Sequence, residues 1–360
     1  MSAGSSALHS NDPFPYDSIG PQERWDSAVA GVGFDDFDPQ GSARFTFDRS
    51  AVFASAGSCF ARRLAMRMHA SSLRYLRTEP GPAWLDPDQR LRYNYVPLSA
   101  RFGEVYTSLQ LLQLLRRACG TFAPEEPPWE AGAAFADPFR PRIQPGGFET
   151  VEMLERDRMF HLAAVQRMFR ELDVFVFTAG LTEVWCSRAD GAAFPVCPGR
   201  AAGRFDRDRY ELRNLSVADN ARYLRDFLAE LRAINPAAKV LLTVSPVPVA
   251  ATMRGTHVAR ASAASKAVLR AAVEEVVIAD PGTDYVAAFE LATAPYFGAT
   301  LFAPDRRNLS DEGVERVMRM FSRHYLPGVE LAPAAPVRED AARIVDAVPC
   351  DEDELLNLLR

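Results

Sequence analysis

The chain has 360 residues, of which 48% are hydrophobic and 24% are charged, and its formal net charge at pH 7 is −6. This composition is typical of a globular protein and excludes a disordered, collagen-like or coiled-coil chain. The basic residues form no block, which argues against nucleic acid as the main partner, and no apolar run approaches the roughly 18 residues of a membrane-spanning helix.

Composition divides the chain into three parts. Residues 1–40 are rich in Ser, Gly, Pro and Asp and predict an irregular extension, whose first 20 residues lack the apolar stretch of a signal peptide. We therefore expect a cytoplasmic protein that does not bind membranes. An α/β domain is expected over residues 41–326, and residues 327–360 form a tail that is Pro- and Ala-rich and then acidic.

Short apolar runs and amphipathic patterns alternate along the expected domain. The runs predict buried strands, and the 3.6-residue patterns predict helices. The predicted strands are residues 52–56, 173–178, 239–244 and 284–289. The predicted helices are residues 60–68, 105–119, 151–172, a segment from the capping box at Ser216 to 234, residues 261–277, and a segment from the cap Ser310 to 325, while 121–148 is a long loop. Such alternation predicts a mostly parallel sheet covered by helices on both faces.

Polar motifs follow three of the predicted strands. They are Gly57-Ser58, the segment 180–183 and Ser245-Pro246, and a fourth polar segment, 305–308, precedes the last helix. Ligands of parallel sheets bind beyond the carboxyl ends of the strands. The sequence therefore predicts a site where these motifs converge.

Ser58 stands between a buried strand and a helix. A serine at this place faces the partial positive charge of a helix N-terminus, which favours an oxyanion and suits a nucleophile. The alternative is that Ser58 simply caps the helix. Cys59 is a second, less favoured nucleophile, because the next residue of a starting helix usually points into the core.

The five cysteines are spread out, and none forms a C-x-x-C pair. An odd and sparse count in a chain of this length predicts reduced thiols, and no His lies at ligand spacing from a Cys, so we expect no metal and no other cofactor. The cysteines are Cys59, Cys119, Cys186, Cys197 and Cys350.

The motif around Ser58 resembles the signature of a known family. The segment Gly57-Ser58-Cys59-Phe60-Ala61 spells the signature of the GSCFA family, which resembles the SGNH hydrolase superfamily. Further blocks are similar to that family in the expected order, and together they cover about residues 20–325. They are residues 94–95, 99–107, 177–185, 244–248, 265–270 and 305–318. The resemblance implies a three-layer α/β sandwich of flavodoxin type.

The resemblance also implies roles by position. Ser58 would be the nucleophile, and the backbone N–H of Gly103 would join the oxyanion hole. The turn 180–183 would supply further groups, with Gly180 as a backbone donor. Thr182 stands where the superfamily usually has an Asn donor. Asp305 would orient the base, but Asn308 occupies the position of the usual histidine.

Asn308 is the departure that matters most, because a carboxamide cannot take a proton from serine near neutral pH. Either another histidine serves, or the protein binds without catalysing, or the residue is a change in this particular chain. His257 is the preferred substitute, since it follows the strand end at Ser245 by a loop. The other histidines, expected at the surface or in structural positions, are His9, His69, His161 and His324.

Three charged residues near the motifs have open roles. Glu104 follows the oxyanion-hole glycine, where a carboxylate opposes developing negative charge, unless it orients a base, binds an acceptor hydroxyl or points to solvent. Glu183 is expected to brace loops by hydrogen bonds. Lys266 either binds an anionic group of the substrate or makes a surface ion pair.

The expected function is that of a serine-dependent acyl-ester hydrolase or acyltransferase acting through Ser58 on a small-molecule or glycan ester, of carbohydrate or polyol type. The rival is a catalytically impaired binding protein that keeps the pocket, which Asn308, Thr182 and Glu104 favour. A third possibility is a role in a biosynthetic assembly through protein contacts, for which the acidic tail 351–360 is the only indication.

Overall fold

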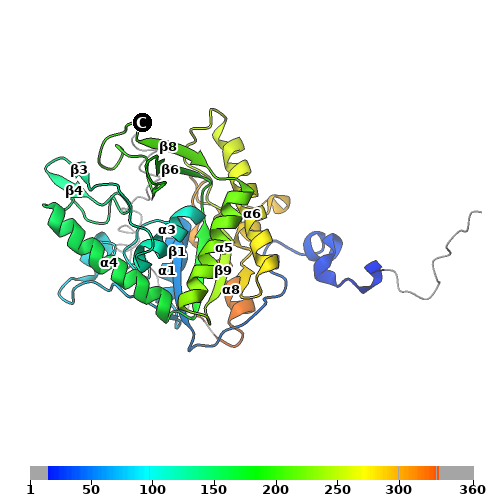
Figure 1. Ribbon diagram of the computed structural model, residues 1–360. Helices are drawn as coiled ribbons and strands as arrows, with labels where there is room; N and C mark the ends of the chain where they lie inside the picture. Colours follow the sequence, from blue (N-terminus) through cyan, green and yellow to red (C-terminus); the bar gives the residue numbers. More distant parts are fainter. Residues whose placement is uncertain (1–14, 97, 299, 330, 332–360) are drawn as a thin grey trace, which may run out of the picture.

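The chain is built around a five-stranded parallel sheet (Figure 1). The computed structural model describes residues 15–331 except 97, 299 and 330. The strands follow the order β10-β9-β5-β1-β2, and each neighbouring pair is parallel. Their bounds are Val52–Gly57 for β1, Arg74–Tyr75 for β2, Val174–Ala179 for β5, Lys239–Val244 for β9 and Thr283–Tyr285 for β10.

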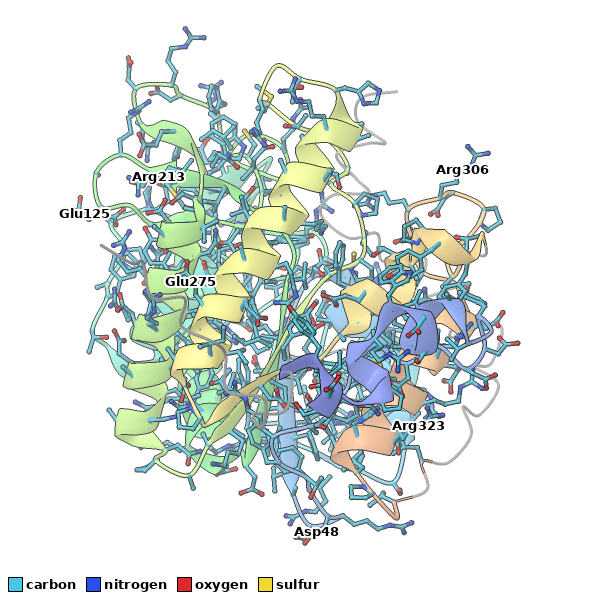
Figure 2. The ribbon with its side chains drawn as sticks, turned by 90° about the vertical axis from the view of Figure 1, so that its right-hand side faces the viewer. Asp48, Glu125, Arg213, Glu275, Arg306 and Arg323 are labelled. Atoms are coloured by element: carbon cyan, nitrogen blue, oxygen red, sulfur yellow. The ribbon has the colours of Figure 1, made fainter. Side chains whose placement is uncertain are left out.

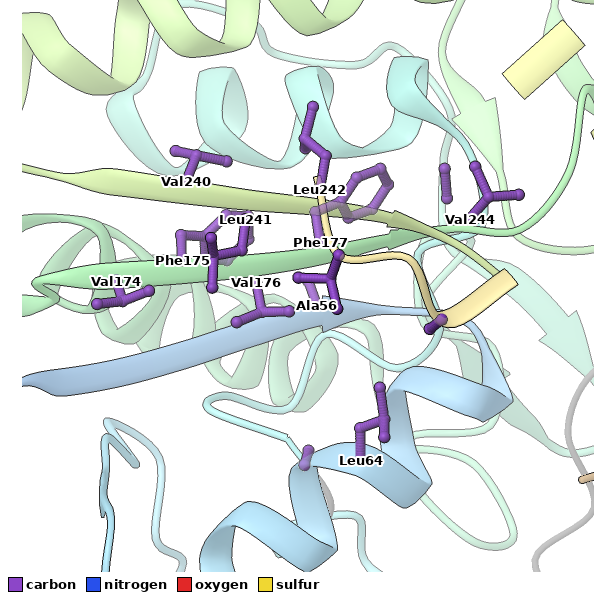
Figure 3. Packing of buried hydrophobic residues seen from close by; sticks show 14 of the residues in the cluster. Ala56, Leu64, Val174, Phe175, Val176, Phe177, Val240, Leu241, Leu242 and Val244 are labelled. Atoms are coloured by element: carbon purple, nitrogen blue, oxygen red, sulfur yellow. The ribbon is translucent and has the colours of Figure 1, made fainter. Parts of the chain in front are cut away.

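The central strands are apolar on both faces because helices cover both faces. Every residue of β5 is buried, and β9 is buried from Val240 onward. Figure 3 shows their side chains leaving the sheet towards helices on either side, with Leu64 of α1 below. Strands covered in this way appear in the sequence as continuous apolar runs, which is the pattern from which they were predicted.

Two helical layers complete a three-layer sandwich. One layer contains α3, α4, α5 and α6, which pack side by side, and the other contains α1, α7 and α8 (Figures 1 and 3). The bounds are Cys59–Ala70 for α1, Ser108–Cys119 for α3, Val151–Glu171 for α4, Val217–Ile234 for α5, Val258–Ala279 for α6, Ala288–Thr293 for α7 and Asp311–Tyr325 for α8; the short α2 is Pro87–Arg92. The expected fold class is therefore confirmed.

Capping residues set the helix starts. Ser216 and Asp219 form the predicted capping box of α5, and Ser310 caps α8. Helix α3 begins three residues later than predicted, because the Thr107 hydroxyl accepts the N–H of Gln110 at 3.2 Å and caps the helix there.

A second, smaller sheet stands at the carboxyl end of the central one and was not predicted. Its strands are Glu183–Ser187 (β6), Ala193–Phe194 (β7) and Tyr210–Asn214 (β8), which pair antiparallel in the order β7-β6-β8. The expected loop 121–148 also contains a hairpin of β3 (Trp129–Ala131) and β4 (Ala134–Ala136). Hairpin and sheet share a small core that includes Trp129, Phe194 and Tyr210. The predicted strand 284–289 is shorter, because α7 begins at Ala288.

The described residues before β1 are irregular. They contain 3₁₀ turns at Pro15–Ser18 and Pro21–Glu23 and a π-helical turn at Asp26–Ala30. Trp25 is 62% exposed, but its ring meets Tyr296 edge to face at 5.0 Å. Residues 1–14 and most of the tail 327–360 lie outside the described residues.

Four of the cysteines are free thiols, as expected: Cys59, Cys119, Cys186 and Cys197. Cys350 lies outside the described residues. Within the described ranges, no helix has both the length and the apolarity needed to cross a bilayer.

Candidate functional site

Ser58 lies at the carboxyl end of β1, between β2 and β5, and is the N-cap residue of α1. This is the predicted placement, but the side chain does not cap the helix. The residue is only 2% exposed, and its hydroxyl has no hydrogen-bond partner in the described part of the chain. Because buried hydroxyls almost always find a partner, an orphaned one calls for an explanation other than capping.

Gly57 fixes the position of Ser58. Its φ of +149° is a conformation that residues with a side chain rarely adopt. A Cβ atom at Gly57 would lie 2.7 Å from the Thr178 carbonyl oxygen and 2.8 Å from the Ala61 Cβ. The glycine therefore lets β1 approach β5 and turn directly into α1.

Gly180 approaches Ser58 closely from the end of β5. A Cβ atom at Gly180 would lie 3.1 Å from the Ser58 Cβ and 3.4 Å from Cδ1 of the Tyr106 ring. The Gly180 N–H, however, donates to the Tyr106 carbonyl at 2.8 Å. The expectation that this N–H serves the oxyanion hole is therefore corrected: it is already occupied, and Gly180 provides space beside the serine instead.

Lys266 reaches the same point from α6. Its ammonium donates to the Gly180 carbonyl at 2.7 Å, and the residue is 4% exposed. The alternative of a surface ion pair is therefore wrong. Lys266 places a buried amino group next to the turn that flanks Ser58.

Gly103 lies in the loop that crosses the end of β1, where the Val105 N–H donates to the Gly57 carbonyl at 2.9 Å. Its φ is +70°, and no atom would contact a Cβ there. Gly103 lines a hollow of about 50 Å³ together with Arg62 and Glu104. Among the described residues, neither the Gly103 N–H nor that of Ser58 donates to an acceptor, so both are available to an oxyanion.

Glu104 is buried and does not point to solvent, so that alternative is wrong. One carboxylate oxygen accepts from the Arg62 guanidinium at 3.1 Å, and the other accepts from the Tyr106 hydroxyl. The ion pair with Arg62 compensates the negative charge beside Gly103. The hydrogen bond from the Tyr106 hydroxyl to the other oxygen of Glu104 holds the Tyr106 ring in place.

Asp305 holds Asn308 as a carboxylate would hold a catalytic imidazole. The Asn308 side-chain amide donates to one oxygen of Asp305 at 2.8 Å, and the backbone N–H groups of Arg307 and Asn308 donate to the other at 2.9 and 3.0 Å. Burial raises the pKa of Asp305, but these donors outweigh it and the net pKa is lowered. Arg306, at the tip of the same loop, points away from the molecule in Figure 2.

The loop of Asp305 is tied to the helix that Ser58 begins. Arg63 of α1 donates to the Leu309 carbonyl and to the Asp311 carboxylate. No hydrogen bond joins Asn308 to Ser58 in the described part of the chain. The structure therefore contains an oriented Asp305–Asn308 pair in a loop that is tied to α1.

His257 is an exposed helix cap. Its Nδ1 accepts the N–H of Ala259 at 3.2 Å at the start of α6. Of the other histidines, His324 contacts Asp38 at 2.9 Å, burial lowers the pKa of His69, and His9 lies outside the described residues. No contact in the described structure brings any of them to Ser58.

His161 is fully buried on α4, where its Nδ1 lies 2.9 Å from a Glu79 oxygen. Burial, and then the charge of Arg140, lower its pKa from 6.5 to about 4. The folded protein thus keeps this imidazole neutral where the unfolded chain protonates it. As pH falls from 6.5 to about 4, the free energy of unfolding should therefore fall by up to about 3 kcal/mol, at about 1.4 kcal/mol per pH unit.

Urea unfolding between pH 4 and 7 measures this effect. In His161→Gln the part of the pH dependence that comes from the imidazole should disappear. The exposed-site control His257→Gln should retain the slope of the unmodified protein. An unchanged slope in His161→Gln would show that this histidine is not held neutral.

Thr182 and Glu183 brace the loops around the site. The Thr182 hydroxyl donates to the Asn214 side-chain oxygen at 2.7 Å, so the position of the usual Asn donor is used internally. Glu183 accepts from the Thr252 hydroxyl at 2.5 Å and from the Met253 N–H at 3.0 Å. This agrees with the expectation that Glu183 holds loops together.

A cavity of about 600 Å³ beside these residues was not predicted from the sequence. It begins at Tyr106 and Leu181, next to Gly180, and extends under the antiparallel sheet. Its walls include Val184, Trp185, Phe194, Phe205, Leu212 and Met253. The alternation of Val184 and Cys186 with half-buried Trp185 along β6 is the one local signal that could have indicated this sheet.

Comparison with known proteins gives one match. The sequence model of the GSCFA family matches residues 52–321, which is 270 of the 360 residues and includes every site residue described above. No curated protein matches the chain, and no solved structure matches it.

Proposed function

The chain belongs to the GSCFA family, and we propose that it is a serine-dependent acyl-ester hydrolase or acyltransferase of the SGNH type, acting on an ester of a carbohydrate or similar polyol. The observation that carries the proposal is the buried, unpartnered hydroxyl of Ser58. It stands at the end of a central parallel strand and at the N-terminus of a helix. Such a place favours negative charge on the reacting oxygens.

In this reaction the Ser58 oxygen attacks the ester carbonyl carbon and its proton passes to a water molecule, which later returns a proton to the leaving alcohol. The negative charge that develops on the carbonyl oxygen is stabilised by the N–H groups of Ser58 and Gly103. The tetrahedral intermediate then expels the alcohol, which takes up a proton, and leaves an acyl-serine. Water resolves this ester in a hydrolase, and an acceptor hydroxyl resolves it in a transferase.

Two features of the site limit the rate. With Asn308 in place, no side chain of the described residues accepts a hydrogen bond from the Ser58 hydroxyl, so the chemical step lacks a general base there. The serine is also 2% exposed, so an ester must displace neighbouring groups to reach it. The Tyr106 ring lies against Gly180, on which Ser58 also packs closely.

A catalytically impaired binding protein is the second proposal, and the Asp305–Asn308 pair favours it. In this pair Asp305 is placed to orient a base, but Asn308 is not a base. The free thiols of the four described cysteines support a reducing compartment such as the cytoplasm for either function.

Covalent labelling of the serine tests the enzyme proposal. A fluorophosphonate probe should label the protein slowly and only at Ser58, detected as one adduct by intact mass and located by peptide mapping. Ser58→Ala should abolish the adduct. Ser216→Ala, which removes a serine that does cap a helix, should leave labelling unchanged. No adduct at Ser58, both in the unmodified protein and in Asn308→His, would favour the binding protein.

A further inference from the structure

We propose that the cavity under the antiparallel sheet binds an apolar acyl chain of the substrate, longer than acetyl, with its carbonyl end directed towards Gly103 and Ser58. The inference rests on the proposed function, since it assigns the cavity to the acyl side of the same ester. It also adds a substrate class that the family match does not supply.

The cavity and the oxyanion-hole region are neighbours. Tyr106 and Leu181 line the cavity, and both flank Gly180, where an added Cβ would lie 3.1 Å from the Ser58 Cβ. The hollow at Gly103 shares two lining residues with the cavity, Arg142 and Pro195. The cavity and the hollow at Gly103 therefore adjoin each other at Arg142 and Pro195.

The walls fit a hydrocarbon chain better than a sugar. Leu181, Val184, Trp185, Leu212 and Val196 are apolar and come from both strands and loops. The wall also carries polar side chains, namely Gln110, Arg142, Glu183, Arg200 and Thr252, so it is the larger apolar part that suits a hydrocarbon chain. The volume of about 600 Å³ falls within the range of small-molecule pockets and is far larger than an acetyl group requires.

The mouth of the cavity exposes large apolar side chains. Met253 is 69% exposed and Phe205 is 48% exposed, although both also line the cavity. The Phe205 ring meets Trp185 edge to face at 5.3 Å. Apolar side chains gathered at a rim in this way mark a binding surface more often than isolated exposed residues do.

Polar side chains of the turn 180–183 hold the loops that form the cavity walls in place. Glu183 binds the loop of Thr252 and Met253, and Thr182 binds Asn214 at the end of β8. The departure of the turn 180–183 from the superfamily pattern thus has a structural consequence. Its side chains support the cavity instead of donating to the reacting oxygen.

Calorimetric titration of the full-length Ser58→Ala protein tests the proposal, because binding is measured without turnover. Sodium decanoate should bind at least tenfold more tightly than sodium acetate. Ala251→Trp, which fills the cavity from a half-buried loop position, should weaken decanoate binding at least tenfold. Ala237→Trp, on an exposed turn that does not line the cavity, is the matched control and should change nothing.

Met253→Ser provides a second variant at an exposed position that keeps its backbone contact with Glu183. It should weaken decanoate binding several-fold. Equal binding of decanoate and acetate, or decanoate binding that both cavity variants leave intact, would overturn the inference. Decanoate binding without Ser58 labelling would keep the cavity assignment and reject the enzyme, whereas labelling without decanoate binding would do the reverse.

Discussion

Replacing Asn308 with His is expected to raise the hydrolysis of p-nitrophenyl esters by a hundredfold or more. Asp305 already accepts the hydrogen bond of the Asn308 side chain at 2.8 Å, so an imidazole there finds its orienting carboxylate in place. An oriented imidazole takes the serine proton near its operating pH, and general-base catalysis typically contributes a factor of about 10² to 10⁴. The gain should appear in kcat/KM measured by release of p-nitrophenolate.

The pH profile and three further variants identify the source of the gain. In Asn308→His the rate should rise with pH through the imidazole pKa, because only the neutral ring accepts a proton. Asn308→Gln keeps a carboxamide and should show no gain. Adding Asp305→Asn should remove most of the gain, and adding Ser58→Ala should remove all of it.

The opposite pattern would mean that another histidine has replaced the base. The unmodified protein would then be active, Asn308→His would change little, and His257→Ala would abolish turnover. The structure makes this pattern unexpected, because the Nδ1 of His257 accepts the N–H of Ala259 and the residue is exposed. Robust activity that survives Ser58→Ala would reject the nucleophile assignment itself.

The parts of the fold that could be predicted are those whose cause is local. β5 and β9 are continuous apolar runs because both faces are covered, and Ser216 and Ser310 start helices through contacts three residues away. The strands β3, β4 and β7 have only two or three residues each. They exist because rings such as Trp129 and Phe194, 5.4 Å apart in space, meet across distant segments. Nothing within such a short segment indicates that partner.

The same distinction explains the site. The place of Ser58 could be predicted because a strand, a glycine and a helix follow one another in the sequence. The roles of Gly180 and Glu104 could not, since they depend on partners from other segments. The Gly180 N–H meets the carbonyl of Tyr106, and the Glu104 carboxylate meets Arg62. The position of Lys266 on the Gly180 carbonyl is likewise a tertiary contact.

Gly57→Ala is expected to lower the free energy of unfolding by about 2–6 kcal/mol. A positive φ forced on a residue with a side chain costs about 1–3 kcal/mol, and overpacking a buried position costs about another 1–3 kcal/mol. Both apply here, because φ is +149° and the added methyl group would lie 2.7 Å from a backbone oxygen of β5. The two atoms that the methyl group would meet, the Thr178 carbonyl oxygen and the Ala61 Cβ, are not free ends of flexible side chains. The overlap can therefore be relieved only if β1 moves away from β5. Urea unfolding followed by circular dichroism measures the loss.

Gly120→Ala separates the two costs. Gly120 ends α3 with a φ of +74°, and nothing would lie within 4 Å of a Cβ there. In Gly120→Ala only the backbone strain applies, so its free energy of unfolding should fall by only about 1–2 kcal/mol. The excess loss in Gly57→Ala then measures the close approach of β1 to β5 that places Ser58. Equal losses in the two variants would mean that β1 has room beside β5, and the position of Ser58 would then need another cause than the packing at Gly57.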